Sequence, residues 1–287
     1  MFKRLFASRK NPYIPGLDNP EHISLNIGGC RLEVDIPPHY NSDGFGAKKE
    51  PTNIPYIYDS DFCDSEGFLF NGLLALRRNF EYLGPVWHTT YLGFTEFSIS
   101  VERVNCLPEG MSCLNPAHLE QVILRFLYED GPESPQFGKK IAPVNWQVKL
   151  IDNQPWVLFE QRPWIRDDDP DRGICLSQFH AYAATALDDR YFLLFDFNNF
   201  GYTPSDISIA NMNAFKNHVI GSIRWQLSDA AQQRLKEVKV QWPDAEISTH
   251  REPEDWIYPE WHKGDRNKGE PYIVIEKYNT QPPEFKF

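Results

Sequence analysis

Residues 191–197 read YFLLFDF, an apolar segment that only Asp196 interrupts. Successive side chains of a β-strand point to opposite faces, so a strand that is apolar at both odd and even positions is buried on both sides. Such a strand sits near the centre of a sheet or under a helix. This segment is therefore expected in the middle of the fold.

Residues 142–198 predict a four-stranded antiparallel meander that ends in this strand. Around Val148, apolar positions alternate with polar ones, which is typical of a strand with one wet face. The chain at 152–154 and 188–189 consists mostly of Asp and Asn, which favour turns. The pattern therefore places neighbouring strands of the meander side by side.

Two helices are expected to pack on this sheet, at about 115–129 and 209–226. In the first, Asn115 can cap the N-terminus and Pro116 suits the first helical position. Apolar side chains recur at spacings of three and four in both segments, so each helix has one face for the core. Ser228 can cap a further short helix.

Two hairpins are expected before the first helix. Residues 22–36 alternate apolar and polar side chains around a central Gly-Gly pair, which easily adopts the positive φ of a tight turn. The Asn-Gly pair at 71–72 predicts the second hairpin, because this dipeptide is the strongest two-residue hairpin signal. A short buried helix starting at Leu73 is the alternative.

The fold class predicted from these elements is α+β, an antiparallel β-sheet with helices packed on it as an α/β/α sandwich. One domain is expected over residues 21–243. Residues 1–20 are expected to be a loose leader, since prolines interrupt them. Residues 244–287 are expected to form an extended strap rich in Pro and aromatic residues, which packs on the domain or on a partner.

The order of hairpin, helix, meander and long helix resembles the PsbP-like α/β/α sandwich family. The apolar strand at 191–197 and the later segment FKNHVIGSI at 215–223 carry this resemblance, which covers about residues 142–226. The resemblance implies a binding or accessory role rather than catalysis. It assigns a functional role to no individual residue.

The amino-acid composition limits which classes of binding partner are expected. The chain carries 29 Lys and Arg against 40 Asp and Glu, a formal net charge of -11. Nucleic acid is therefore not an expected partner, because phosphate binding needs a basic patch, whereas a basic protein would be attracted. No membrane span and no signal peptide are recognised, so a cytoplasmic location is expected. The oligomeric state stays open.

The five cysteines include no C-x-x-C pair, so neither a zinc site nor a disulfide framework is expected. Asp167, Asp169 and Asp171 alternate as calcium-loop ligands do. Arg172, however, stands where such a loop needs glycine, and no Glu stands at its twelfth position. A solvated acidic turn is the alternative, and no metal or other cofactor is expected.

His180 is the candidate for proton transfer. It shares a strand face with Tyr182, and a cleft formed by these two residues and His88 could move a proton. The alternative is a histidine that is hydrogen-bonded on a wet sheet face. Nucleophile and metal motifs such as G-x-S-x-G and H-E-x-x-H are absent, which argues against an enzyme without excluding one.

Four tryptophans are candidates for a binding surface: Trp156, Trp164, Trp256 and Trp261. Large aromatic residues dominate many interfaces, although they also fill cores. The leading functional hypothesis is a non-enzymatic binding or accessory protein, of a bacterial immunity or secretion-associated type, that uses an acidic and aromatic surface. The alternatives are a small-molecule hydrolase or isomerase that uses His180, and a small-ligand binder without chemistry.

Overall fold

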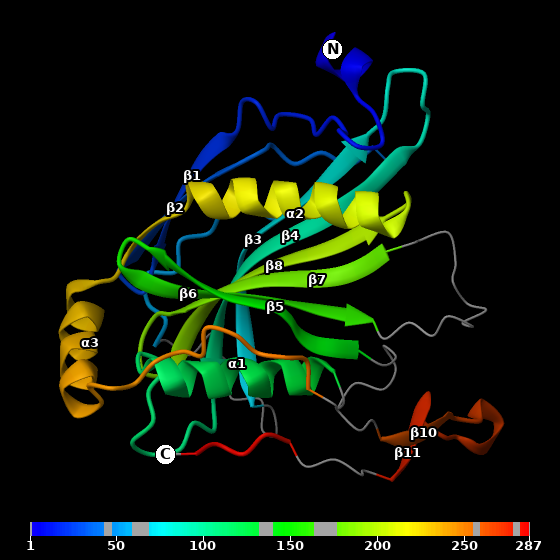
Figure 1. Cartoon of the computed structure of the whole chain (residues 1–287). Helices are drawn as coiled ribbons and strands as arrows, with labels where there is room; N and C mark the ends of the chain where they lie inside the picture. The colour runs from blue at the N-terminus through cyan, green and yellow to red at the C-terminus, as the bar shows by residue number, and fades with distance from the viewer. Residues whose placement is uncertain are drawn as a thin grey trace.

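The computed structural model describes residues 2–42, 48–58, 69–131, 140–163, 177–254, 259–277 and 282–286. These residues form an α+β protein with antiparallel sheets and helices packed on them, which confirms the predicted fold class. Figure 1 shows helices α1 (Pro116–Asp130) and α2 (Ser205–Ser222) on opposite sides of the main sheet.

The main sheet has six strands in the order β3-β4-β8-β7-β6-β5, and all neighbours are antiparallel. Their bounds are β3 Phe70–Leu83, β4 Tyr91–Val104, β5 Lys140–Ile151, β6 Gln154–Pro163, β7 Ser177–Ala186 and β8 Tyr191–Gly201. Strands β5 to β8 are the predicted meander. Strand β8 lies inside the sheet between β4 and β7, as its two apolar faces predicted.

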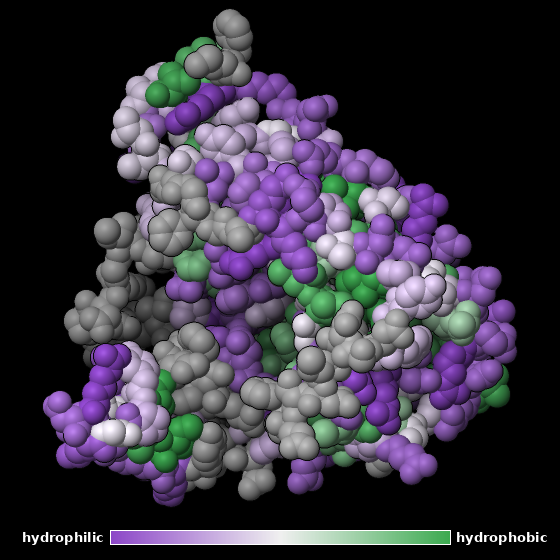
Figure 2. Space-filling model, turned by 180° about the vertical axis from the view of Figure 1, so that it is seen from behind, coloured by the Kyte–Doolittle hydropathy of each residue, from purple (hydrophilic) through white to green (hydrophobic). Residues whose placement is uncertain are grey.

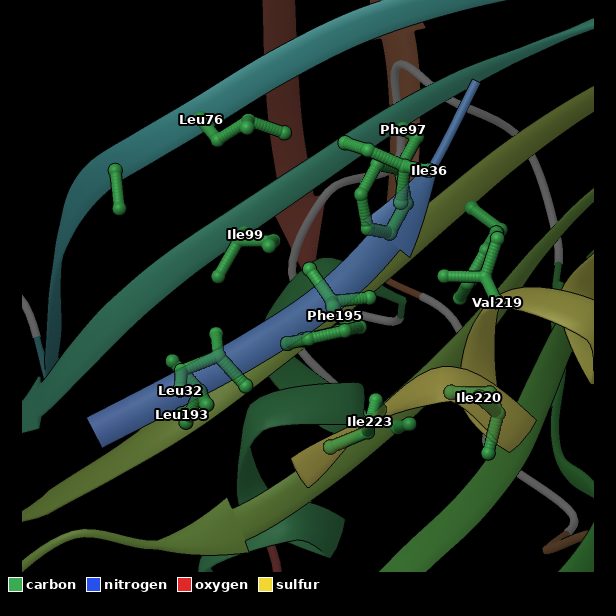
Figure 3. Packing of buried hydrophobic residues seen from close by; sticks show 14 of the residues in the cluster. Leu32, Ile36, Leu76, Phe97, Ile99, Leu193, Phe195, Val219, Ile220 and Ile223 are labelled. Atoms are coloured by element: carbon green, nitrogen blue, oxygen red, sulfur yellow. The ribbon is translucent and has the colours of Figure 1, made fainter. Parts of the chain in front are cut away.

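One face of this sheet is covered continuously. Leu193, Phe195 and Phe197 of β8 point to this face and are fully buried. Helix α2 packs here, beside a three-stranded sheet of β1 (Glu21–Ile27), β2 (Cys30–Ile36) and β9 (Arg224–Gln226). Figure 3 shows Leu32 and Ile36 of β2 packed over the same apolar residues of the sheet as the side chains of α2.

The opposite face is covered only in part. Phe192 and Leu194 of β8 pack there with Leu119 and Leu127 of α1. Farther along the same face, β8 continues with Asp196 and Asn198, which lie outside this second core. The boundary between apolar and polar residues on one strand therefore marks where the cover of α1 ends.

The expected hairpin at 71–72 is wrong, and so is the alternative helix, because both residues lie inside the single strand β3. Gly72 pairs with Glu102 of β4, and a Cβ at Gly72 would meet the Oε2 atom of Glu102 at 2.7 Å. Glycine at this position therefore makes room for the carboxylate of Glu102 and does not form a turn.

The second predicted helix is shifted in sequence. Helix α2 begins at Ser205 and ends at Ser222, and residues 224–226 pair with β2 instead of extending the helix. Ser228 caps α3 (Asp229–Gln241), as predicted, by accepting a hydrogen bond from Ala231 N. Sheet pairing after Ser222 therefore ends the helix before its apolar pattern does.

Other parts of the chain cover the outer edge of β3. Tyr13 and Leu83 exchange two backbone hydrogen bonds. Farther along the edge, the backbone N–H groups of Tyr40, Lys49 and Thr52 donate to carbonyl groups of β3. The N-terminal 3-10 helix η1 (Phe2–Phe6) lies beyond Tyr13.

The C-terminal residues contact α1. The Ser248 hydroxyl donates to Glu120 at 2.8 Å, and the side chain of Gln121 exchanges two hydrogen bonds with the backbone of Lys286. Between these contacts, β10 (Glu260–Lys263), η3 (Arg266–Lys268) and β11 (Ile273–Lys277) form a separate hairpin.

No helix within the described residues combines the length and the apolar character that crossing a membrane requires. The surface seen from behind is mostly hydrophilic and is hollowed near its middle (Figure 2).

Candidate functional site

The candidate site lies on the part of the sheet that α1 leaves uncovered. His180 of β7 pairs with Asn198 of β8, and Tyr182 pairs with Asp196. His180 and Asp196 are thus diagonal neighbours on one face, and the Nδ1 atom of His180 lies 3.0 and 3.2 Å from the two Asp196 carboxylate oxygens. With its proton on Nδ1, the imidazole donates to Asp196, and Nε2 is the nitrogen left for a ligand.

Two opposing effects act on the pKa of His180. Burial lowers the pKa, because it disfavours the charged imidazolium, whereas the charge and hydrogen bond of Asp196 raise it. Asp130 raises the pKa further and Lys140 lowers it. The net direction is upward, so His180 holds its proton to a higher pH than an exposed histidine does.

Tyr182 supports the His180 ring. The two rings are stacked with their centroids 5.6 Å apart, and Phe159 stacks on Tyr182 at 5.0 Å. Burial, followed by the charges of Asp196, Asp130 and Glu102, raises the pKa of Tyr182 well above its ordinary value. The phenol therefore stays neutral and serves to hold the histidine ring rather than to act as a base.

A cavity of about 300 Å³ opens beside His180. Its described lining consists of Asp130, Lys140, Gln161, Pro163, Gln178, Phe179 and His180. The Nζ atom of Lys140 lies 2.7 Å from Oδ2 of Asp130, so the end of α1 and the start of β5 are tied together at the wall of the cavity. Groups of both charge signs therefore border a space that fits a small molecule.

Gln161 brings an unsatisfied polar group to this cavity. Its side chain is 1% exposed, and its Nε2 atom has no hydrogen-bond partner within the described residues. Its oxygen lies 3.5 Å from the Tyr182 hydroxyl. A buried amide without a partner is costly, since its lost hydration is not replaced.

Glu102 adds a buried carboxyl group on the same face of the sheet. The Ser100 hydroxyl donates to it at 2.6 Å. Burial, together with the charge of Asp196, raises the pKa of Glu102, and the Ser100 hydrogen bond only partly opposes this. The histidine and this carboxyl group therefore both hold protons more readily than they would in water.

The lining suits acid–base chemistry or binding, because it includes a histidine paired with a carboxylate. The described residues that border the cavity include no Ser, Thr or Cys nucleophile. The described part of the chain also contains no group of three His, Cys, Asp or Glu side chains arranged to hold a metal ion. A histidine held by a carboxylate is, in contrast, the usual arrangement for a general acid or base.

The predicted site residues separate into two groups. His180 and Tyr182 lie together with their rings stacked, as their shared strand face predicted, and His180 lines the cavity. His88 does not join them, because it lies between β3 and β4, and its Nδ1 lies 2.8 Å from the carbonyl oxygen of Thr90. The predicted cleft of His180, Tyr182 and His88 is therefore reduced to the two residues on β7.

The predicted tryptophans within the described residues differ in whether they are exposed. Trp156 is not available as a surface contact, because it is fully buried between the sheet and its cover, with its ring 5.4 Å from that of Phe195. Trp261 is 44% exposed on β10. The remaining candidates lie outside the described residues: Trp164, Trp256, Asp167, Asp169 and Asp171.

Sequence reasoning missed Asp196 and Gln161 as site residues. Asp196 had a visible signal, since it is the one charged residue in the apolar strand at 191–197. Gln161 had none, because its place beside His180 follows from the register of β6 against β7.

Comparison of the chain with models of known protein families finds no match, and comparisons with curated proteins and with solved structures find none. The resemblance to the PsbP-like sandwich therefore stays a prediction.

Proposed function

We propose that the protein binds a small polar molecule in the cavity beside His180 and catalyses a proton transfer on it, as a hydrolase or an isomerase. The observation that carries this proposal is the His180–Asp196 pair at the wall of a cavity. The polar lining residues Gln161, Gln178 and Lys140 support a polar ligand.

His180 would act through Nε2. When the imidazole is neutral and its Nδ1 proton is directed at Asp196, Nε2 is a base that removes a proton from the ligand or from water. When it is protonated, the same nitrogen returns the proton as an acid. Asp196 stabilises the charged form and holds the ring orientation, as the carboxylate of a catalytic triad does.

The test is a substrate screen with matched histidine variants. Simple esters, amides, phosphate esters and α-protonated carbonyl compounds are offered to the wild-type chain, to His180→Gln and to His218→Gln. His218 lies exposed on α2 and serves as the control. Loss of a general acid–base group typically lowers turnover about 10²- to 10⁴-fold, so His180→Gln is expected to fall in this range. Turnover that His180→Gln retains would contradict the proposal.

A second candidate is the binding of a basic protein without catalysis. Trp261 and Tyr272 of the β10–β11 hairpin are 44% and 58% exposed, and the chain carries a net charge of -11. Exposed aromatic residues on an acidic chain suit such a partner. A partner retained at low salt by the wild-type chain but released by a Trp261→Ala, Tyr272→Ala double variant would support this candidate. Equal retention by both would argue against it.

A further inference from the structure

One end of the molecule exposes a cluster of large apolar side chains. Phe6 is 83% exposed and Trp87 is 72% exposed, and their neighbours in sequence, Leu5 and Val86, are 42% and 41% exposed. Isolated exposed apolar residues are ordinary, whereas a cluster on a folded protein marks an interaction surface. We name these four residues the apolar tip.

Hydrogen bonds hold the two halves of the apolar tip together. The Arg4 guanidinium donates to the carbonyl oxygens of Gly84 and His88 at 3.1 and 3.2 Å, so η1 is fixed on the turn between β3 and β4. The Tyr13–Leu83 bridge fixes the same segment again. Asn211 of α2 donates to the carbonyl oxygen of Arg9 at 2.8 Å. Figure 1 shows the N-terminus and the β3–β4 turn at the same end of the molecule.

The charge at this end is opposite to that of the chain. Four basic residues, Lys3, Arg4, Arg9 and Lys10, lie in the N-terminal segment, while residues 2–17 and 82–95 contain no Asp or Glu. Asp18 pairs with one of these basic residues, its carboxylate lying 2.7 Å from Lys3 Nζ in an exposed pair. Arg9 and Lys10 are exposed. The apolar tip therefore lies at a basic end of a chain whose net charge is -11.

We propose that the apolar tip docks on the surface of an anionic lipid membrane. Trp and Phe side chains favour the boundary between headgroups and acyl chains, and Lys and Arg side chains bind anionic headgroups. The acidic remainder of the chain is repelled by the same surface. Charge thus favours both the occupant and the orientation, since this basic end of the molecule is attracted to an anionic bilayer.

The membrane is favoured over an acidic protein by the kind of contact that the tip offers. The four apolar residues come from a five-residue 3-10 helix and a turn. A specific protein interface of standard size requires about 800 Å² of complementary surface on each side. Shallow insertion of a few side chains beside basic residues is sufficient for a bilayer.

Vesicle co-sedimentation with the full chain tests the proposal. At about 0.1 M salt, where the Debye length is about 10 Å, the chain is expected to bind vesicles of phosphatidylcholine with about one-third phosphatidylserine more tightly than pure phosphatidylcholine vesicles. A Phe6→Ala, Trp87→Ala double variant is expected to bind at least about tenfold more weakly. Arg9→Gln and Lys10→Gln are each expected to reduce binding about fivefold.

Tyr56→Ala is the matched control, because it removes an aromatic side chain that is 73% exposed in another part of the chain. It is expected to bind vesicles as the wild-type chain does. Equal binding to neutral and anionic vesicles, or no binding to either, would overturn the proposal. Self-association that Phe6→Ala, Trp87→Ala abolishes, in a chain that ignores vesicles, would instead assign the tip to a second copy of the chain. Binding of a polyglutamate peptide but not of anionic vesicles would assign it to an acidic protein.

Discussion

The two faces of the six-stranded sheet differ in how completely they are covered, although the same strands build both. On the α2 side, β8 contributes Leu193, Phe195 and Phe197 to a continuous apolar core. On the α1 side, Leu194 is followed by Asp196, and the helix ends where the polar residues begin. One face serves mainly stability, and the uncovered half of the other leaves room for the candidate site.

The largest effect is expected from Phe195→Ala on the covered face. Phe195 is fully buried, and its ring lies 5.6 Å from that of Phe97. Its removal should lower the free energy of unfolding by about 3–5 kcal/mol, since it loses buried area and leaves a cavity. Urea denaturation measures the change. Phe200→Ala, at a half-buried position on the same strand, should cost clearly less; equal losses would erase the difference between the faces.

Asp196→Asn should have the next largest effect. It removes the charge that holds the His180 imidazolium, and hydrogen bonds to charged groups contribute about 1.5–3 kcal/mol. Because both side chains are 26% exposed, a loss of about 1.5 kcal/mol is expected at the acidic pH where His180 is charged. The pKa of His180, followed by NMR, should fall at the same time. Asp206→Asn, at an exposed position on α2, should leave the pKa of His180 unchanged.

Glu102→Gln should stabilise the protein at neutral pH. Burial raises the pKa of Glu102 in the folded state. The contribution of Glu102 to stability therefore falls as pH rises from the pKa of the unfolded state through the pKa of the folded state. Removing the charge should therefore add about 1 kcal/mol at pH 7, and the gain should vanish near pH 4, where both states are protonated. Thermal unfolding at the two pH values measures this. Glu109→Gln, at an exposed position, is expected to leave the stability unchanged at both pH values.

The smallest effect concerns the pH dependence of the pair. The pKa of His180 is raised in the folded state, so its stabilising contribution is complete below the unfolded value of about 6.5 and is lost as pH rises through the folded value. The difference in unfolding free energy between the wild-type chain and His180→Gln should thus shrink with rising pH. A difference that grows over this range would show that Asp196 does not control the histidine.

Much of the fold was predictable because it depends on local patterns. Alternation along 22–36 and 142–198 predicted strands, and Asn115 and Pro116 predicted the start of α1. The Asn-Gly pair at 71–72 wrongly predicted a hairpin, because this glycine makes room for the Glu102 carboxylate of the neighbouring strand instead of forming a turn. The end of α2 was missed for the same reason, since pairing with β2 decides it.

The candidate site was predictable only within a single strand. His180 and Tyr182 share a face by the two-residue period of a strand, and their rings stack on that face. Asp196 and Gln161 reach the same place through the registers of β7 with β8 and of β6 with β7. Register between strands depends on long-range packing, so no local pattern placed either residue beside His180, although Asp196 stands out as the one charged residue of its apolar strand.

The covering of β3 bears on how the protein behaves at high concentration. A bare outer strand is a template on which another copy can add its own strand and start aggregation. Here Tyr13, Tyr40, Lys49 and Thr52 already occupy hydrogen-bonding groups along that strand. Growth of ordered aggregates from this side would first require the covering chain to peel away, which gives the folded protein a built-in guard against filament formation.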